Sequence, residues 1–210
     1  AVADLRADLI ATARALQPSG LGKGTAGNVS VRDGDGFLIT PTGLAYEDLV
    51  PDDLPRMALD GSWSGQRKPS SEWRFHRDLY ATRPETGAVL HAHSPFAVSL
   101  ACLRRDIPPF HYMIARFGGD TVRCAPYAIF GSQALSTAAL AAMEGRAGCL
   151  LANHGMLVAG RDLAEALALA VELEALCEHY WRACQVGRPV LLDTGEMAEA
   201  LERFKSYGQP

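Results

Sequence analysis

The feature that most constrains the fold is the stretch Asp33-Gly34-Asp35-Gly36, which separates two short apolar segments. Aspartate and glycine are typical of tight turns between antiparallel strands, because such turns require positive φ angles. The stretch therefore predicts strands at 28–32 and 37–40 that pair as a hairpin. A hairpin in a chain that otherwise mixes strands with helices favours a three-layer α/β domain over a purely parallel sheet.

Hydrophobic periodicity and helix-boundary residues place the remaining elements. The predicted helices cover 4–16, the stretch after Pro69 to about 82, a segment opening at Ser94-Pro95, and 132–143, 162–187 and 195–205. The predicted strands cover 87–93, 121–125 and 149–152. No internal repeat or interdomain linker is evident, and 210 residues suit one large α/β domain spanning 1–210.

Composition narrows the class of protein. The net charge of −4 gives no basic footprint for nucleic acid or an anionic membrane. No run of 18 apolar residues predicts a membrane span, and residues 1–17 indicate an amphipathic helix rather than a targeting peptide. The five cysteines are odd in number and lack C-x-x-C spacing, which predicts a reduced, cytoplasmic protein without a cysteine zinc site.

The strongest local signal for chemistry is His91-Ala92-His93 at the end of a predicted strand. Residues i and i+2 of a strand point to the same side, so both imidazoles can reach one ion. An isolated H-x-H is about as often an ordinary polar strand end. Asn153-His154-Gly155 follows another apolar strand and changes that balance. Three histidines and one carboxylate would complete a tetrahedral catalytic metal site, whereas His76 and His179 fit surface or packing roles.

Glu72 is the best candidate for the carboxylate, although a glutamate at a helix start often serves only the helix dipole. Ser70 and Ser71, just before it, offer hydroxyls and N–H groups suited to a phosphate, although N-capping alone would also explain them. The small-residue loop 24–30 and the segment 40–43 have the same character, and each alone is a plausible turn. None matches a P-loop or dinucleotide fingerprint. Together they indicate a phosphate site.

These segments occur in an order that resembles the class II aldolase/adducin family. The matching segments are Gly24–Ser30, Ile39–Gly43, Pro69–Arg74, His91-x-His93, Pro109–Met113, Cys124–Tyr127, Asn153-His154-Gly155 and Phe204–Gly208. The likeness runs nearly end to end and is strongest to members that cleave L-fuculose 1-phosphate. It implies an α/β/α fold with a central, mainly antiparallel sheet, assembled as a homotetramer with active sites between subunits.

The resemblance also implies roles for individual residues. His91, His93 and His154 match the ligands of one Zn²⁺ per chain, with Mn²⁺ or Co²⁺ as alternatives, and Glu72 matches an acid/base that also ligates the resting metal. Tyr112 matches a catalytic tyrosine donated by the neighbouring subunit, and Tyr207 a C-terminal tyrosine near the same site. The positions matching the phosphate site are Gly27, Asn28, Thr42, Gly43, Ser70 and Ser71.

The activity implied is that of a class II aldehyde-lyase. Such an enzyme reversibly cleaves a ketose 1-phosphate, here L-fuculose 1-phosphate or a 5-deoxypentulose 1-phosphate, to dihydroxyacetone phosphate and an aldehyde. The same superfamily includes epimerases, dehydratases and decarboxylases of phosphorylated compounds, which remain alternatives. It also includes non-catalytic, adducin-like assembly modules, but the histidines and the glutamate are all present here. A zinc hydrolase would not need the hydroxyl-rich loops.

Overall fold

The computed structural model describes residues 4–22 and 25–207, and its centre is an eight-stranded sheet. The strand order is β4-β3-β2-β1-β5-β8-β7-β6, and only the pair β6–β7 is parallel. The strands are β1 (Asn28–Asp33), β2 (Gly36–Ile39), β3 (Arg56–Ala58), β4 (Trp63–Ser64), β5 (Ala88–Ala92), β6 (Cys124–Ala125), β7 (Gly148–Leu151) and β8 (Gly155–Gly160). The predicted hairpin is confirmed, with Asp33 opposite Gly36.

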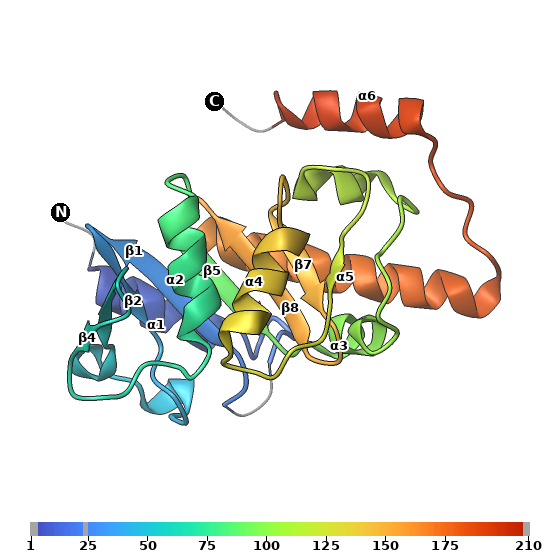
Figure 1. Cartoon of the computed structure of the whole chain (residues 1–210). Helices are drawn as coiled ribbons and strands as arrows, with labels where there is room; N and C mark the ends of the chain where they lie inside the picture. The colour runs from blue at the N-terminus through green and yellow to red at the C-terminus, as the bar shows by residue number, and fades with distance from the viewer. Residues whose placement is uncertain (1–3, 23–24, 208–210) are drawn as a thin grey trace.

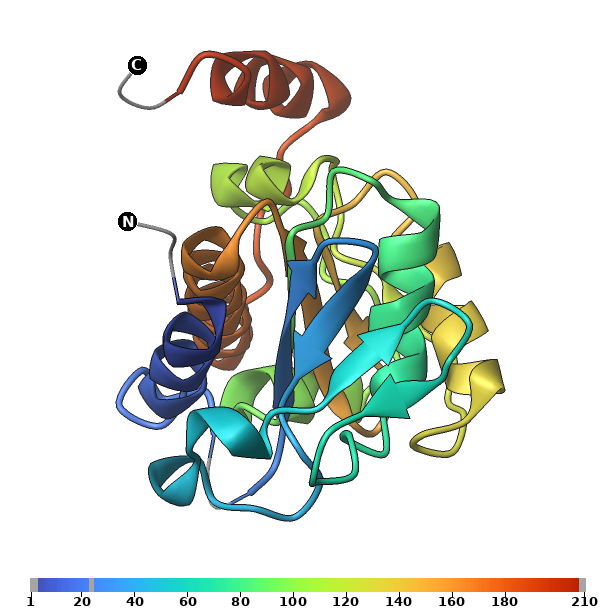
Figure 2. The ribbon, with the colours of Figure 1, turned by 90° about the vertical axis from the view of Figure 1, so that its left-hand side faces the viewer.

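Helices cover both faces of the sheet (Figures 1 and 2). One layer contains α1 (Leu5–Ala15), α3 (Pro95–Ala101) and α5 (Leu163–Val186), and the other contains α2 (Trp73–Thr82) and α4 (Gln133–Ala142). The last helix, α6 (Thr194–Phe204), stands apart at the top of Figure 1 and contacts the 3₁₀ helix η3 (Tyr112–Phe117). Two further 3₁₀ turns are η1 (Tyr46–Asp48) and η2 (Pro51–Asp53). The predicted α/β/α fold with a mainly antiparallel sheet is confirmed.

The centre of the sheet is apolar on both faces. Along β5, Leu90 belongs to the core under α1, α3 and α5, whereas its neighbour Val89 belongs to the core under α2 and α4. Val158 and Leu157 divide in the same way on β8. Because successive side chains of a strand point to opposite faces, β5 and β8 are locked from both sides. The polar residues at their ends are therefore held on a rigid support.

Local sequence explains where the long helix begins and ends. The Asp162 side chain accepts a hydrogen bond from the Glu165 backbone N–H at 2.8 Å, and the helix stops at Gly187, as predicted. Other predictions were less accurate. The strand predicted at 121–125 is reduced to β6, because Val122 forms only an isolated bridge with Ile107. Strands β3, β4 and β8 were not predicted.

Within the described ranges, none of the helices combines the length and apolar composition that a membrane crossing requires. All five cysteines have free thiols. Two residues of the family motifs, Gly24 and Gly208, lie outside the described residues.

Candidate functional site

Four side chains that are far apart in sequence converge at one end of the central strands. Each of Glu72, His91, His93 and His154 offers one ligand atom, and these atoms all lie within 4.8 Å of one another. His91 is in β5, His93 follows that strand, and His154 lies in the turn between β7 and β8. The antiparallel pairing of β5 with β8 brings the end of one strand beside the start of the other. Glu72 reaches the group from the cap of α2.

The turn that carries His154 depends on its two neighbours. Asn153 has a φ of 55°, in the left-handed region that asparagine tolerates better than most residues. Gly155 starts β8 so close to β5 that a Cβ at this position would overlap the carbonyl oxygen of Ala92. Asn153 and Gly155 therefore suit the backbone of this turn, and the turn places the imidazole of His154 beside that of His93.

Hydrogen bonding fixes the tautomer of His91. Its Nδ1 lies 2.8 Å from the carbonyl oxygen of Met156, which can only accept, so Nδ1 carries the proton. Its Nε2 faces the other site residues, 2.9 Å from Nε2 of His93 and 3.2 Å from Oε2 of Glu72. This ring nitrogen and the carboxylate oxygen can lie so close only with a proton or a cation between them. The backbone of β8 thus prepares His91 as a ligand.

The protonation states of the other members suit a metal. Burial, reinforced by the neighbouring His91, lowers the pKa of both His93 and His154 to about 4, so both imidazoles are neutral at pH 7. Burial raises the pKa of Glu72, but His91, His154 and the Asn28 amide outweigh this effect and bring it to about 2. The group therefore presents neutral His93 and His154 together with His91 and one carboxylate, a donor set that suits Zn²⁺.

A buried oxygen without a partner provides a test of this fit. Oε1 of Glu72 is buried and accepts no hydrogen bond, although Nε2 of His154 lies 3.2 Å away. An unpaired carboxylate oxygen in the interior is costly unless something compensates its charge. A cation between this oxygen and the three imidazoles would do so. The residues present therefore fit a metal ion.

Glu72 differs in one respect from the prediction that it is a helical residue. Helix α2 begins at Trp73, and Glu72 is the N-cap residue, with no hydrogen bond from its side chain to the helix. The carboxylate is instead directed at the histidines and accepts a hydrogen bond from Asn28 Nδ2 at 3.1 Å. The role of a dipole-stabilising glutamate is therefore secondary to its place among the site residues.

The loops with the predicted phosphate-binding residues meet beside Glu72. The Ser70 N–H donates to the Thr40 carbonyl oxygen at 3.0 Å, which places the segment of Ser70 and Ser71 next to that of Thr42 and Gly43. Gly27 has a φ of +92°, and a Cβ there would lie 2.7 Å from the carbonyl oxygen of His91. The third loop therefore reaches the same place.

Not every group in these loops is available to a ligand. The backbone N–H of Ser70 is used by Thr40, and the N–H of Glu72 donates to Ser70 Oγ at 3.3 Å. The side chains of Thr42 and Ser71 are exposed, as is Gly43. Asn28 is buried, and its amide bonds both Glu72 and His76. The prediction that His76 serves packing missed this contact.

The two predicted tyrosines lie away from the histidines of their own chain. Tyr112 begins η3, whose last residue, Phe117, accepts a hydrogen bond from Ala147 just before β7. That is the end of β7 opposite to His154, and Figure 1 shows α6 at the same upper end, whereas α3, which follows His93, lies low. Tyr207 follows α6 and contacts Phe204 edge to face. Both tyrosines are well exposed, by 55% and 83%.

A cavity of about 340 Å³ adjoins the histidines. Glu72, His93 and His154 line one part of it, and Tyr127 and Phe130 line another. These two aromatic residues are more than half exposed. Sequence analysis did not select them individually, although Tyr127 ends the family motif 124–127. An exposed aromatic pair next to polar ligands is suited to the carbon chain of a small organic substrate.

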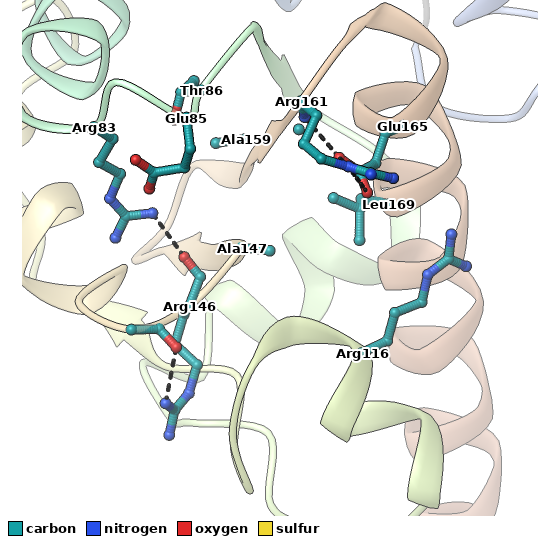
Figure 3. Close-up of a pocket in the computed structure, with 12 residues that line it drawn as sticks. Arg83, Glu85, Thr86, Arg116, Arg146, Ala147, Ala159, Arg161, Glu165 and Leu169 are labelled. Carbon is teal, nitrogen blue, oxygen red and sulfur yellow. Dashed lines mark hydrogen bonds and ion pairs between the residues drawn. The ribbon is translucent and has the colours of Figure 1, made fainter. Parts of the chain in front are cut away.

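A second cavity, of about 410 Å³, lies at the opposite end of β5 and β8 and is lined by several arginines (Figure 3). Arg83 donates to the carbonyl oxygen of Arg146 at 2.9 Å, and Arg146 in turn donates to that of Thr121 at 3.1 Å. Arg161 is paired with Glu165. These guanidinium groups are thus engaged by carbonyl oxygens and a carboxylate of the same chain.

Fold and site together define an α/β protein in which four side chains suited to a metal ion lie beside hydroxyl-rich loops. The model of the class II aldolase and adducin N-terminal domain family matches residues 7–181, and the chain belongs to this family. It is 56% identical over 204 residues to the 5-methylthioribulose-1-phosphate/5-deoxyribulose-1-phosphate aldolase of Rhodospirillum rubrum, covering 97% of this chain and 92% of the relative.

Two further relatives extend the comparison. The L-fuculose phosphate aldolase of Escherichia coli K12 is 42% identical over 205 residues, covering 97% of this chain and 95% of that protein. A solved structure of an L-fuculose 1-phosphate aldolase superposes with a TM-score of 0.93 at 40% identity, covering 98% of each chain. The match therefore includes nearly the whole length of both proteins.

Proposed function

We propose that this chain is a metal-dependent aldolase that reversibly cleaves a ketose 1-phosphate to dihydroxyacetone phosphate and an aldehyde. The observation that carries the proposal is the convergence of three imidazoles and Glu72 beside three hydroxyl-rich loops. The names of the similar proteins support the substrate class. We rank 5-deoxyribulose 1-phosphate and 5-methylthioribulose 1-phosphate ahead of L-fuculose 1-phosphate, because identity is 56% to the first relative and 42% to the second.

His91, His93 and His154 would hold the ion, with Glu72 as a further ligand in the resting enzyme. We propose Zn²⁺, because neutral imidazoles and one carboxylate suit it, with Mn²⁺ or Co²⁺ as alternatives. When bound, the ion supplies Lewis-acid polarisation of the substrate's carbonyl and adjacent hydroxyl oxygens. The chain's own residues then have three tasks, which are to bind the phosphate, to hold the reacting carbon and to move protons.

Phosphate binding falls to the loops beside Glu72. The residues proposed for it are Gly27, Asn28, Thr42, Gly43, Ser70 and Ser71. An anchored phosphate fixes the position of the reacting carbon relative to Glu72 and the histidines, and good alignment of this kind contributes several kcal/mol. We assign Glu72 as the group that returns a proton to that carbon after cleavage, and removes it in the direction of synthesis.

The aldehyde half requires a second proton carrier. We assign this role to Tyr112 of a neighbouring subunit, which would take the proton from the departing aldehyde's hydroxyl, with Tyr207 nearby. The exposure of both tyrosines and their distance along the fold from the histidines of the same chain support this assignment. It requires an oligomer, and we propose a cytoplasmic homotetramer with active sites between subunits.

The experiment is a coupled assay for dihydroxyacetone phosphate with each of the three candidate substrates, with and without chelator. We expect chelator-sensitive release, about one metal per chain, and faster turnover of the 5-deoxy and 5-methylthio substrates. The Glu72→Gln variant should lose activity by about 10²–10⁴-fold. Glu85→Gln, at the distant arginine-lined cavity, is the matched control and should retain it. Bound metal without release would contradict the aldolase, and absence of metal would favour an assembly module.

A further inference from the structure

We propose that His76 is a positioning residue that fixes the orientation of the Asn28 amide and, through it, the carboxylate of Glu72. The proposal starts from a continuous chain of buried polar groups under the site. Asn28 Nδ2 lies 3.1 Å from Glu72 Oε2, and Asn28 Oδ1 lies 2.5 Å from His76 Nε2. His76 Nδ1 lies 2.7 Å from Ser30 Oγ, which lies 2.8 Å from the Tyr80 hydroxyl.

The positions of these residues in sequence explain why they meet. His76 and Tyr80 follow Glu72 at intervals of four, so they lie on one face of α2. Asn28 and Ser30 are two apart on β1, so they point to one face of that strand. His76 and Tyr80 of the helix therefore pack against Asn28 and Ser30 of the strand. The exposed fractions of Asn28, Ser30, His76 and Tyr80 are 3%, 0%, 0% and 2%, so water does not replace these contacts.

The hydrogen atoms of this chain can be assigned in order from the carboxylate. Ionised Glu72 only accepts, so the Asn28 group next to it is the amide nitrogen, which donates. The amide oxygen of Asn28 then faces His76, and because this oxygen only accepts, Nε2 of His76 must carry a proton. The carboxylate thus determines the orientation of the Asn28 amide and, through it, the presence of a proton on His76 Nε2.

The protonation state of the other ring nitrogen, Nδ1 of His76, follows from burial. An imidazolium with no exposure and no carboxylate in contact is unfavourable, and burial lowers the pKa of His76 to about 3. Neutral His76 has its single proton on Nε2, so Nδ1 accepts from the Ser30 hydroxyl. Ser30 Oγ in turn accepts from the Tyr80 hydroxyl. Each donor in the chain therefore has one acceptor, and no other arrangement satisfies them all.

The consequence for the site concerns the two oxygens of Glu72. Asn28 donates to Oε2, whereas Oε1 is left without a hydrogen bond beside His154. If the Asn28 amide turned over, its oxygen would face the carboxylate, and repulsion would move Glu72 away from the histidines. The Nε2–H of His76 opposes this turn, because it can donate to the amide oxygen but would find no acceptor in the amide nitrogen. His76 acts through Asn28 and makes no hydrogen bond of its own to Glu72 or to the three histidines.

The first test reads the tautomer directly and is independent of turnover. In the zinc-loaded, ¹⁵N-histidine-labelled protein at pH 7, we expect His76 to give the spectrum of a neutral imidazole protonated at Nε2. A proton on Nδ1, or an imidazolium, would overturn the assignment. Because the kinetic consequence rests on the proposed aldolase function, this spectrum separates a failure of the positioning role from a failure of that function.

The second test uses a matched pair of variants. The amide nitrogen of glutamine reaches the position of histidine Nε2, so His76→Gln can still donate to Asn28. Asparagine reaches only the position of Nδ1, so His76→Asn cannot. We expect His76→Asn to weaken Zn²⁺ binding in a chelator competition and to lower kcat, each by about 10–100-fold. We expect His76→Gln to recover most of both losses.

A variant at Tyr80, the last residue of this chain of hydrogen bonds, controls for packing. Tyr80→Phe removes the last hydroxyl, but the Ser30 hydroxyl can still donate to His76, so metal affinity and kcat should change by less than about threefold. Circular dichroism and thermal unfolding verify that all variants fold. Equal losses in His76→Gln and His76→Asn, or a loss in Tyr80→Phe as large as in His76→Asn, would overturn the proposal.

Discussion

Gly155→Ala tests whether the approach of β8 to β5 builds the site. An added Cβ at Gly155 would overlap the Ala92 carbonyl oxygen and lie 3.1 Å from Cδ2 of His93. Overpacking of this kind costs about 1–3 kcal/mol. We expect the upper part of that range, roughly 2–3 kcal/mol, because β5 is paired on both sides and cannot move freely. At about 2–4 °C per kcal/mol for a chain of this size, the melting temperature should fall by several degrees.

The same change should disturb the chemistry. Relief of the overlap moves the start of β8 away from β5, which separates His154 from His91 and His93. A displacement of about 1 Å in such a site can cost on the order of 100-fold in rate, so both Zn²⁺ affinity and kcat/KM should fall by about tenfold or more. Chelator competition measures the affinity, thermal unfolding the stability and release of dihydroxyacetone phosphate the activity.

Gly187→Ala is the control for this experiment. Its backbone is extended, with a φ of 172°, and an added Cβ would meet no atom within 4 Å. The free energy of unfolding should therefore change by no more than about 0.5 kcal/mol. If Gly155→Ala were as stable as Gly187→Ala and bound Zn²⁺ equally well, the close approach of the two strands would not be what positions His154.

Three further predictions follow from the site. The pKa of buried His76, lowered to about 3, means that the unfolded chain binds a proton that the folded chain does not. The contribution of neutral His76 to the free energy of unfolding is therefore full above pH 6.5 and falls toward pH 3 by up to about 1.4 kcal/mol per pH unit. Urea unfolding of the metal-free His76→Gln variant, measured across this pH range, should show a correspondingly shallower fall. Chelation should abolish release of dihydroxyacetone phosphate and lower the melting temperature, and both should return with added Zn²⁺. Co-refolding Glu72→Gln with Tyr112→Phe should restore activity that neither variant has alone, because a mixed oligomer contains sites in which both residues are intact. Activity that is not restored would show that each site uses the tyrosine of its own chain.

The sequence predicted those parts of the structure that depend on neighbouring residues. The apolar run before His91 predicted a central strand, and the Asp-Gly turn predicted the antiparallel hairpin of β1 and β2. The boundaries of α5 followed from Asp162 and Gly187. Strand β8 was missed because Gly155, which permits its close approach to β5, was considered only as part of the Asn153-His154-Gly155 motif. Its apolar run 156–159 has the composition of a buried strand.

Contacts between residues far apart in the sequence were not predicted. The spacing of Glu72, His76 and Tyr80 predicts one helical face, but it does not show what that face contacts. Only the packing of α2 against β1 shows that this face meets Asn28 and Ser30, which turns a residue assigned to packing into part of the site. The aromatic residues of the cavity were missed for the same reason, because the pocket exists only after four separate segments have come together.

Two groups that do not belong to the proposed metal ligands determine how those ligands are presented. The Met156 carbonyl fixes the proton of His91 on Nδ1, and His76 fixes the Asn28 amide that donates to Glu72. One orients the His91 ring and the other an oxygen of Glu72; Met156 lies on β8 and His76 on α2, so both groups lie in regular elements rather than in loops. A metal entering the site therefore meets ligands whose tautomers and orientations are already set, so little reorganisation opposes binding. Loss of either support should weaken metal affinity even when all four ligands remain in the sequence.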